Sequence, residues 1–144
     1  MLNFVLRRVT KFILPIKDEI PRHYTFGDTS LLWYYSRMFS SLAGVCMDNG
    51  DYNCAVNYFR RALDFDPNRL RLHYYLAGAL EKNNNCQEAE KEYLKVYELN
   101  NQANFVFKDL FRLAKNCFKD EEKIKKYSLP PTPQKNKEIL LKDL

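Results

Sequence analysis

A spacing of 34 positions relates two segments in the middle of this 144-residue chain. At this spacing apolar positions stay apolar, small positions stay small, and aromatic positions stay aromatic. Such self-similarity marks a helical hairpin that is stacked on a copy of itself. Two helices approach closely only where small side chains lie at their crossing, so the period predicts an all-α fold, a short antiparallel helical solenoid. The related pairs are Leu42 and Leu76, Ala43 and Ala77, Ala55 and Ala89, and Phe59 and Tyr93.

Turn-forming residues separate the expected helices of the first copy. Gly50-Asp51-Tyr52 falls between its two helices, and Asp66-Pro67-Asn68 closes it. Glycine supplies the left-handed backbone that a helix end needs. Proline cannot continue a helix interior, so we expect Pro67 in the first turn of the next helix. Together with the paired positions, these residues resemble the tetratricopeptide repeat over residues 36–101.

The second copy departs from that family's pattern at three places. His73 stands where the family usually has Trp, Asn84-Asn85 replaces Gly-Asp in the turn, and Asn101 replaces the closing Pro. Because Asn also adopts left-handed backbone, we expect Asn84 to end a helix as Gly50 does. We expect the His73 side chain to be buried or half-buried. The resemblance implies two helix-turn-helix repeats whose usual function is to bind other proteins.

Helical spacing continues beyond the two copies. Residues 102–117 match only the first helix of a third copy, which predicts a capping helix. Residues 120–127 place acids first and lysines last, as a helix dipole favours. The other expected helices lie at about 30–48, 52–65, 69–83 and 86–99. The predicted domains are an N-terminal amphipathic helix with its connector (1–28), a helical domain (29–117), and a charged helix with a Pro-rich tail (118–144).

The residue content argues against catalysis, metal binding and nucleic-acid recognition. There are two His, no His with a partner that would make it a base, and no Gly-rich phosphate loop, so we predict neither an enzyme nor a cofactor site. The four Cys form no CxxC pair and are not clustered with His, so a zinc site is not expected. Because most of them fall at apolar helical positions, we expect reduced, structural thiols. The formal net charge of +5 is spread along the chain, and no nucleic-acid partner is expected.

The family resemblance also implies where a partner binds, because the first helix of each repeat lines a groove. The chaperone-binding members grip a C-terminal carboxylate with Lys and Asn at groove positions that are Ser40 and Gly44 here, so a cochaperone is not expected. The remaining positions favour a protein partner with an acidic or aromatic-containing segment, and the alternative is an ordinary solvated surface. The candidate groove residues are Arg37, Arg71, Tyr74, Phe105, Lys108 and Arg112, with Met47, Gly78, Glu81 and Lys115 on the same surface.

The N-terminal segment combines an apolar face with basic residues. Residues 2–14 follow helical spacing, and no acid occurs before Asp18. Three interpretations stay open: a cleaved mitochondrial targeting sequence, a helix on a membrane surface, and a helix docked on a partner. We rank cleavage last. An uncleaved import signal is compatible with the other two, so we expect a mitochondrion or another organelle, with the cytoplasm as the alternative. The candidate contact residues are Phe4, Arg7, Arg8, Lys11 and Phe12.

These features predict a non-catalytic scaffold for protein–protein interaction. Helical repeats bury their cores only by stacking, and about three units are usually needed. With two copies and a cap, we expect an accessory or assembly subunit of a larger complex, with an organellar membrane complex as one setting. Two alternatives stay open: a free adaptor that binds an acidic peptide in a basic groove, and a peripheral membrane protein held by residues 2–14.

Overall fold

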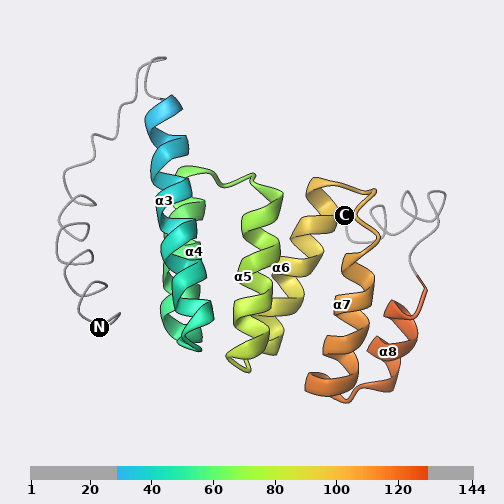
Figure 1. Cartoon of the computed structure of the whole chain (residues 1–144). Coiled ribbons are helices and arrows are strands. Elements are labelled where there is room, and N and C mark those ends of the chain that lie inside the picture. Colours follow the sequence, from blue (N-terminus) through green and yellow to red (C-terminus); the bar gives the residue numbers. More distant parts are fainter. Residues whose placement is uncertain (1–28, 130–144) are drawn as a thin grey trace. The chain divides into compact units, whose positions relative to one another are not determined.

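A computed structural model of the chain describes residues 29–129. This part contains six α-helices, one π-helical segment and no strand (Figure 1), so the predicted all-α class is confirmed. The description below concerns the second of two units into which the chain divides, which begins at Leu32. The predicted N-terminal helix, its connector and the Pro-rich tail lie outside the described residues. The elements are α3 (Thr29–Asp48), α4 (Tyr52–Phe65), α5 (Leu70–Lys82), α6 (Cys86–Leu99), α7 (Val106–Leu113), η1 (Ala114–Phe118) and α8 (Glu121–Tyr127).

Left-handed backbone at two predicted positions closes the two hairpins. Gly50 has φ +73° between α3 and α4, and Asn84 has φ +59° between α5 and α6. The next helix of the first hairpin begins at once, because the Asp51 carboxylate accepts a hydrogen bond from the backbone N–H of Cys54 at 3.0 Å. The expected turns are therefore confirmed, and α4 and α6 have the predicted bounds.

Two boundaries differ from the prediction. Pro67 lies in the turn before α5 and not in its first helical turn. The cap helix α7 begins four residues later than expected, because Asn100 holds a turn in place: its backbone carbonyl accepts from the N–H of Ala103 at 2.9 Å, and its side-chain oxygen accepts from the N–H of Gln102 at 3.0 Å. Asn side chains compete with helical hydrogen bonding in this way. The expected single helix over 102–117 thus becomes a turn, α7 and the π-helical η1.

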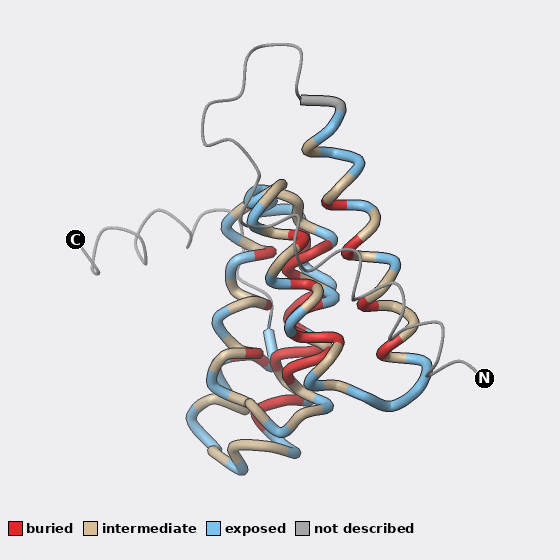
Figure 2. Tube along the Cα trace, turned by 90° about the vertical axis from the view of Figure 1, so that its left-hand side faces the viewer, coloured by how far each residue is buried: buried red, intermediate tan, exposed pale blue. Residues whose placement is uncertain are grey.

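Small residues lie where the helices of the hairpins cross. Ala43, Ala55, Ala77 and Ala89 are all fully buried, with 0% of their surface exposed. Larger side chains, among them those of Phe59, Leu76 and Tyr93, are buried as well, and in Figure 2 the buried positions gather toward the centre of the helices. The predicted close approach of the paired helices is therefore present.

The short helix α8 packs back onto the repeats. Its Tyr127 side chain is only 4% exposed, and its hydroxyl donates to Glu90 of α6 at 2.6 Å. The Tyr127 ring also lies 6.4 Å from that of Phe107 in α7. The helical packing therefore continues to Tyr127, ten residues beyond the predicted domain boundary at 117. None of the described helices combines the length and apolar character needed to cross a bilayer.

The cysteines differ from the expectation of reduced thiols. Disulfides join Cys46 to Cys54 and Cys86 to Cys117, with Cα atoms 5.7 and 6.2 Å apart, and no described cysteine is left over. Both Cα separations lie in the range that disulfides span. The expectation is wrong because it treated each thiol as a small apolar group on its own helix. The turn brings the end of α3 to the start of α4, and the cap brings η1 to the start of α6.

We expect reduction to destabilise this chain. Cross-links over 8 and 31 residues stabilise the folded state by about 2.5 and 3.7 kcal/mol in the chain-entropy account. Urea unfolding with and without dithiothreitol should therefore give a lower midpoint for the reduced protein. The Cys86→Ser, Cys117→Ser double variant should lose more unfolding free energy than a variant that lacks the Cys46–Cys54 disulfide. Thiols that react with an alkylating agent before reduction, or an unchanged midpoint, would contradict the pairing.

Candidate functional site

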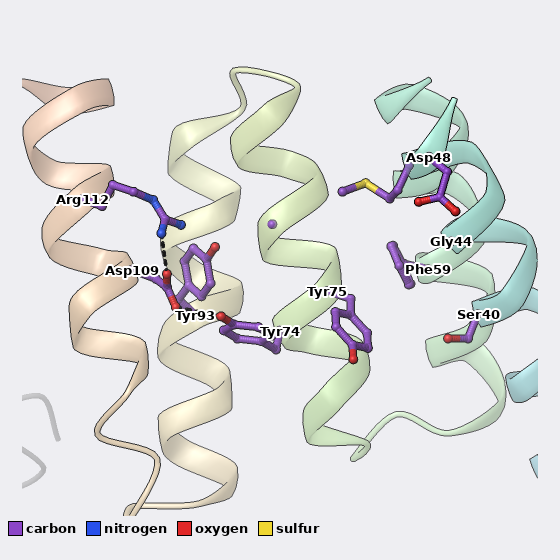
Figure 3. Close-up of a pocket in the computed structure, with 11 residues that line it drawn as sticks. Ser40, Gly44, Asp48, Phe59, Tyr74, Tyr75, Tyr93, Asp109 and Arg112 are labelled. Carbon is purple, nitrogen blue, oxygen red and sulfur yellow. Dashed lines mark hydrogen bonds and ion pairs between the residues drawn. The ribbon is translucent and has the colours of Figure 1, made fainter. Parts of the chain in front are cut away.

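A groove runs across α3, α5 and α7, the first helices of the two repeats and of the cap. It encloses a cavity of about 430 Å³, within the range of sites that hold ligands or side chains of a partner. In Figure 3 the side chains of α3 and α7 form opposite walls, and those of α5 lie between them. Aromatic residues of α4 and α6 reach the cavity between the first helices. The lining residues are Ser40, Gly44, Met47, Asp48, Phe59, Tyr74, Tyr75, Gly78, Tyr93, Asp109 and Arg112.

Two glycines keep the groove open. A Cβ atom added at Gly44 would meet no atom within 4 Å, and one added at Gly78 would only touch the Tyr93 hydroxyl at 4.0 Å. Glycine inside a helix costs about 1 kcal/mol relative to alanine. Neither glycine is needed for close packing of the helices. Both positions therefore carry the helix-propensity cost of glycine, and a larger side chain at either one would fill part of the groove.

An ion-pair cluster forms one wall of the groove. The Arg112 guanidinium donates to both carboxylate oxygens of Glu81, at 3.0 Å from Nε and 2.8 Å from Nη2. Its Nη1 lies 2.7 Å from Oδ1 of Asp109 (Figure 3). Bidentate pairs of this kind fix geometry as well as charge. The cluster thereby joins α5 to α7.

Two tyrosines complete the cluster. The Tyr74 hydroxyl donates to Oδ2 of Asp109 at 3.0 Å, and the Tyr93 hydroxyl donates to Oε2 of Glu81 at 3.0 Å. Burial first, and then the hydrogen bond to Asp109, raise the pKa of Tyr74. Burial and the neighbouring Glu81 carboxylate raise the pKa of Tyr93 well above its usual value. Both hydroxyls therefore remain protonated donors.

The charges of the cluster support one another. Burial alone would raise the pKa of Glu81, but hydrogen bonds from Arg112 and Tyr93 outweigh it and hold that pKa below its usual value of 4.5. The hydrogen bonds to Glu81 in turn raise the pKa of Arg112. Two carboxylates thus surround one cation, and Asp109 is only 7% exposed.

The structure brings some predicted groove residues together and separates others. Tyr74 and Arg112 line the cavity, and the exposed Phe105 ring lies 5.5 Å from that of Tyr74. Arg71 donates to the Tyr75 hydroxyl at 3.1 Å at the edge of the cavity. Phe105 and Arg71 thus lie beside the cavity without lining it. The other two predicted groove residues are also absent from the lining: Arg37 lies 5.0 Å over the Trp33 ring, and Lys108 is exposed on α7.

Arg112 was expected as a cation available to an acidic partner, whereas its guanidinium is held by Glu81 and Asp109. Asp109 was not predicted as a groove residue, because the repeat spacing was used to place the groove positions of each helix on a single face. The spacing of three between Asp109 and Arg112 on one helix was a usable signal. The candidate contact residues Phe4, Arg7, Arg8, Lys11 and Phe12 lie outside the described residues.

His73 occupies a structural position between helices. The predicted burial of His73 is confirmed at 8% exposure; its Nδ1 lies 2.6 Å from Glu92 and its Nε2 lies 2.8 Å from the Pro67 carbonyl. These contacts tie α5 to α6 and to the preceding turn, and His73 is not among the residues that line the cavity. Within residues 29–129 no three His, Cys, Asp or Glu side chains are grouped so that they could hold a metal ion.

A comparison with protein families finds a match over the centre of the chain. The family model of the tetratricopeptide repeat matches residues 47–104, which contain all of α4, α5 and α6. Repeats of this family generally mediate protein–protein interaction, and they are typically non-catalytic modules. No curated protein matches the chain.

We expect the Glu81→Gln variant to change how stability depends on pH. Because the folded pKa of Glu81 lies below 4.5, its ionised form stabilises the fold above that pH, and the contribution is lost as the pH falls through the lowered value. Thermal unfolding is followed by circular dichroism from pH 7 to pH 3. The unfolding midpoint of wild type should lie above that of the variant at neutral pH, and the difference between the two midpoints should shrink below pH 4.5.

The matched control is Glu98→Gln, because Glu98 is exposed and its ion pair is with Lys95 on the same helix. We expect that substitution to have a small effect throughout. A difference between wild type and Glu81→Gln that stays constant down to pH 3 would refute the role given to this carboxylate.

Proposed function

Because the family model of the tetratricopeptide repeat matches residues 47–104, we propose that the chain is a non-catalytic scaffold, an accessory or assembly subunit of a larger protein complex. The observation that carries the proposal is the groove across α3, α5 and α7, with its cavity of about 430 Å³ kept open by Gly44 and Gly78. In this family protein–protein interaction is the general function, and a groove of this size can take side chains of a partner.

Exposed aromatic residues near the start of α3 support a resident subunit over a free adaptor. The side chains of Trp33 and Tyr34 are 48% and 65% exposed. Adjacent exposed aromatic side chains favour burial against another protein. The chain also stacks only two repeats and a cap. Both features favour a protein whose apolar surface is buried inside a complex over a separate molecule.

The proposed partner presents an acidic surface to the rim of the groove. Arg37, Arg71 and Lys108 are exposed on α3, α5 and α7, and exposed cations steer an acidic partner and set its orientation more than they add affinity. The same observation supports the second candidate, a free adaptor for an acidic peptide. The proposed setting in a mitochondrion or another organelle, and contact of residues 2–14 with a partner or a membrane surface, rest on the sequence pattern alone.

The first test fills the groove. Gly44→Leu adds a side chain where nothing lies within 4 Å of the new Cβ, and it replaces a poor helix former by a good one, so the variant should fold. In the cells that make this protein, tagged wild type should migrate on native electrophoresis in a particle far larger than 17.2 kDa. Gly44→Leu should shift toward its own mass.

Ser41→Leu is the matched control, because Ser41 is exposed on the same helix and does not line the cavity. It should leave the large particle intact. Wild type that runs near its own mass would rule out the resident subunit, and a Gly44→Leu variant that stays in the particle would rule out the groove as its attachment.

The two candidate functions differ in their dependence on the rim. If the chain is a free adaptor for an acidic peptide, the Arg37→Glu, Arg71→Glu double variant should lose its ligand. If it is a resident subunit, the double variant should assemble into the complex more slowly but still assemble. Recovery of the large particle after salt extraction and dialysis measures this. Complete loss of the particle in the double variant would favour the adaptor.

A further inference from the structure

The charge inside the groove is opposite to the charge of its rim. Asp48, at the end of α3, and Asp109, on α7, line opposite walls (Figure 3), and Glu81 adds a third carboxylate behind the Arg112 guanidinium. Three carboxylates therefore lie at the groove, two of them paired with the Arg112 guanidinium, and a second cation, Arg71, lies over the Tyr75 ring at the edge of the cavity. The pocket as a whole favours a positive group over a negative one.

Arg112 does not offset this preference for an incoming anion. Its Nε and Nη2 donate to Glu81, and its Nη1 pairs with Asp109. A carboxylate that approached Arg112 would meet the two carboxylates already bound to it. A cation that approached the same wall would meet carboxylate oxygens with remaining lone pairs.

Aromatic faces line the space between the two acidic walls. The rings of Phe59 and Tyr75 are stacked with centroids 6.0 Å apart, and Tyr74 lies 6.1 Å from Tyr75. The face of an aromatic ring attracts an ammonium or guanidinium group, and aromatic pockets are a common means of recognising cations. The methylene stem of a lysine or arginine also packs well on such rings.

The backbone adds to the same preference. Asp48 is the last residue of α3, and Glu81 is the next to last residue of α5. The carbonyl ends of helices carry a partial negative charge. The carboxylates and two helix C-termini therefore act together at this end of the groove.

We propose that the pocket receives a lysine or arginine side chain from a segment of the partner protein, with its charged group between Asp48 and the Glu81–Asp109–Arg112 cluster and its stem against Tyr74 and Tyr75. This inference rests on the proposed function, since it names the chemistry of the partner residue that anchors in the groove. The exposed cations of the rim then contact acidic residues that flank this basic anchor.

The direct test uses capped single amino acids as probes. The full-length, ¹⁵N-labelled chain is titrated with N-acetyl-arginine amide, N-acetyl-lysine amide and N-acetyl-glutamate amide at equal ionic strength. The two cationic probes should shift the backbone amides of Gly44 and Gly78, which line the pocket, in a saturable way. The anionic probe should leave these amides in place.

A conservative variant separates the pocket charge from general charge effects. Asp48→Asn removes one wall carboxylate that makes no ion pair within the described residues, so the fold should persist. It should weaken arginine-amide binding about two- to fivefold, the range for one exposed charge pair. Asp64→Asn, an exposed site on α4 that does not line the pocket, should leave the affinity unchanged.

The outcomes distinguish this inference from the function on which it rests. If the glutamate probe shifts Gly44 and Gly78 at least as strongly as the arginine probe, or if Asp48→Asn and Asp64→Asn weaken binding equally, the basic anchor is refuted while the scaffold function stands. If the native particle persists in Gly44→Leu, the proposed attachment through the groove is refuted whatever the probes show.

Discussion

Close approach of paired helices is the constraint on which the rest of the structure depends. Ala43, Ala55, Ala77 and Ala89 have no exposed surface, and each occupies a crossing where a larger side chain would push two helices apart. Because the alanines recur at one spacing, successive hairpins stack in the same orientation. The first helices then lie side by side, and side chains three and four residues apart on each of them face one groove.

The groove needs the cap as well as the repeats. Glu81 and Arg112 are 31 residues apart, and Tyr74 and Asp109 are 35 residues apart, so one wall exists only because α7 packs beside α5 and α6. The disulfide to Cys117 and the buried Tyr127 of α8 hold α7 in that place. The segment that the repeat pattern marks as an incomplete third copy is therefore a structural part of the groove.

The repeated positions made most of the fold predictable, because small and aromatic residues that recur at a fixed period are compatible with few folds. The bounds of α4 and α6 follow from turn residues whose backbone preferences are strong, Gly50 and Asn84. The start of α7 was not predictable in this way, because the side chain of Asn100 competes for the backbone N–H groups that would otherwise join a helix. The disulfides were missed because pairing depends on distances between helices and not on spacing along one helix.

The charge of the groove shows why its chemistry could not be obtained by counting residues. The chain carries a formal net charge of +5, and the charged residues among its predicted groove positions are mostly basic. The fold separates these charges. Arg112 forms ion pairs with two carboxylates, whereas Arg37, Arg71 and Lys108 are exposed and form no ion pair among the described residues. Because Arg112 is paired with two internal carboxylates, an external anion that approached it would also meet their negative charge. The groove is therefore best understood as an acidic, aromatic pocket with a basic rim, and the partner that we propose for it carries both signs of charge in a fixed order.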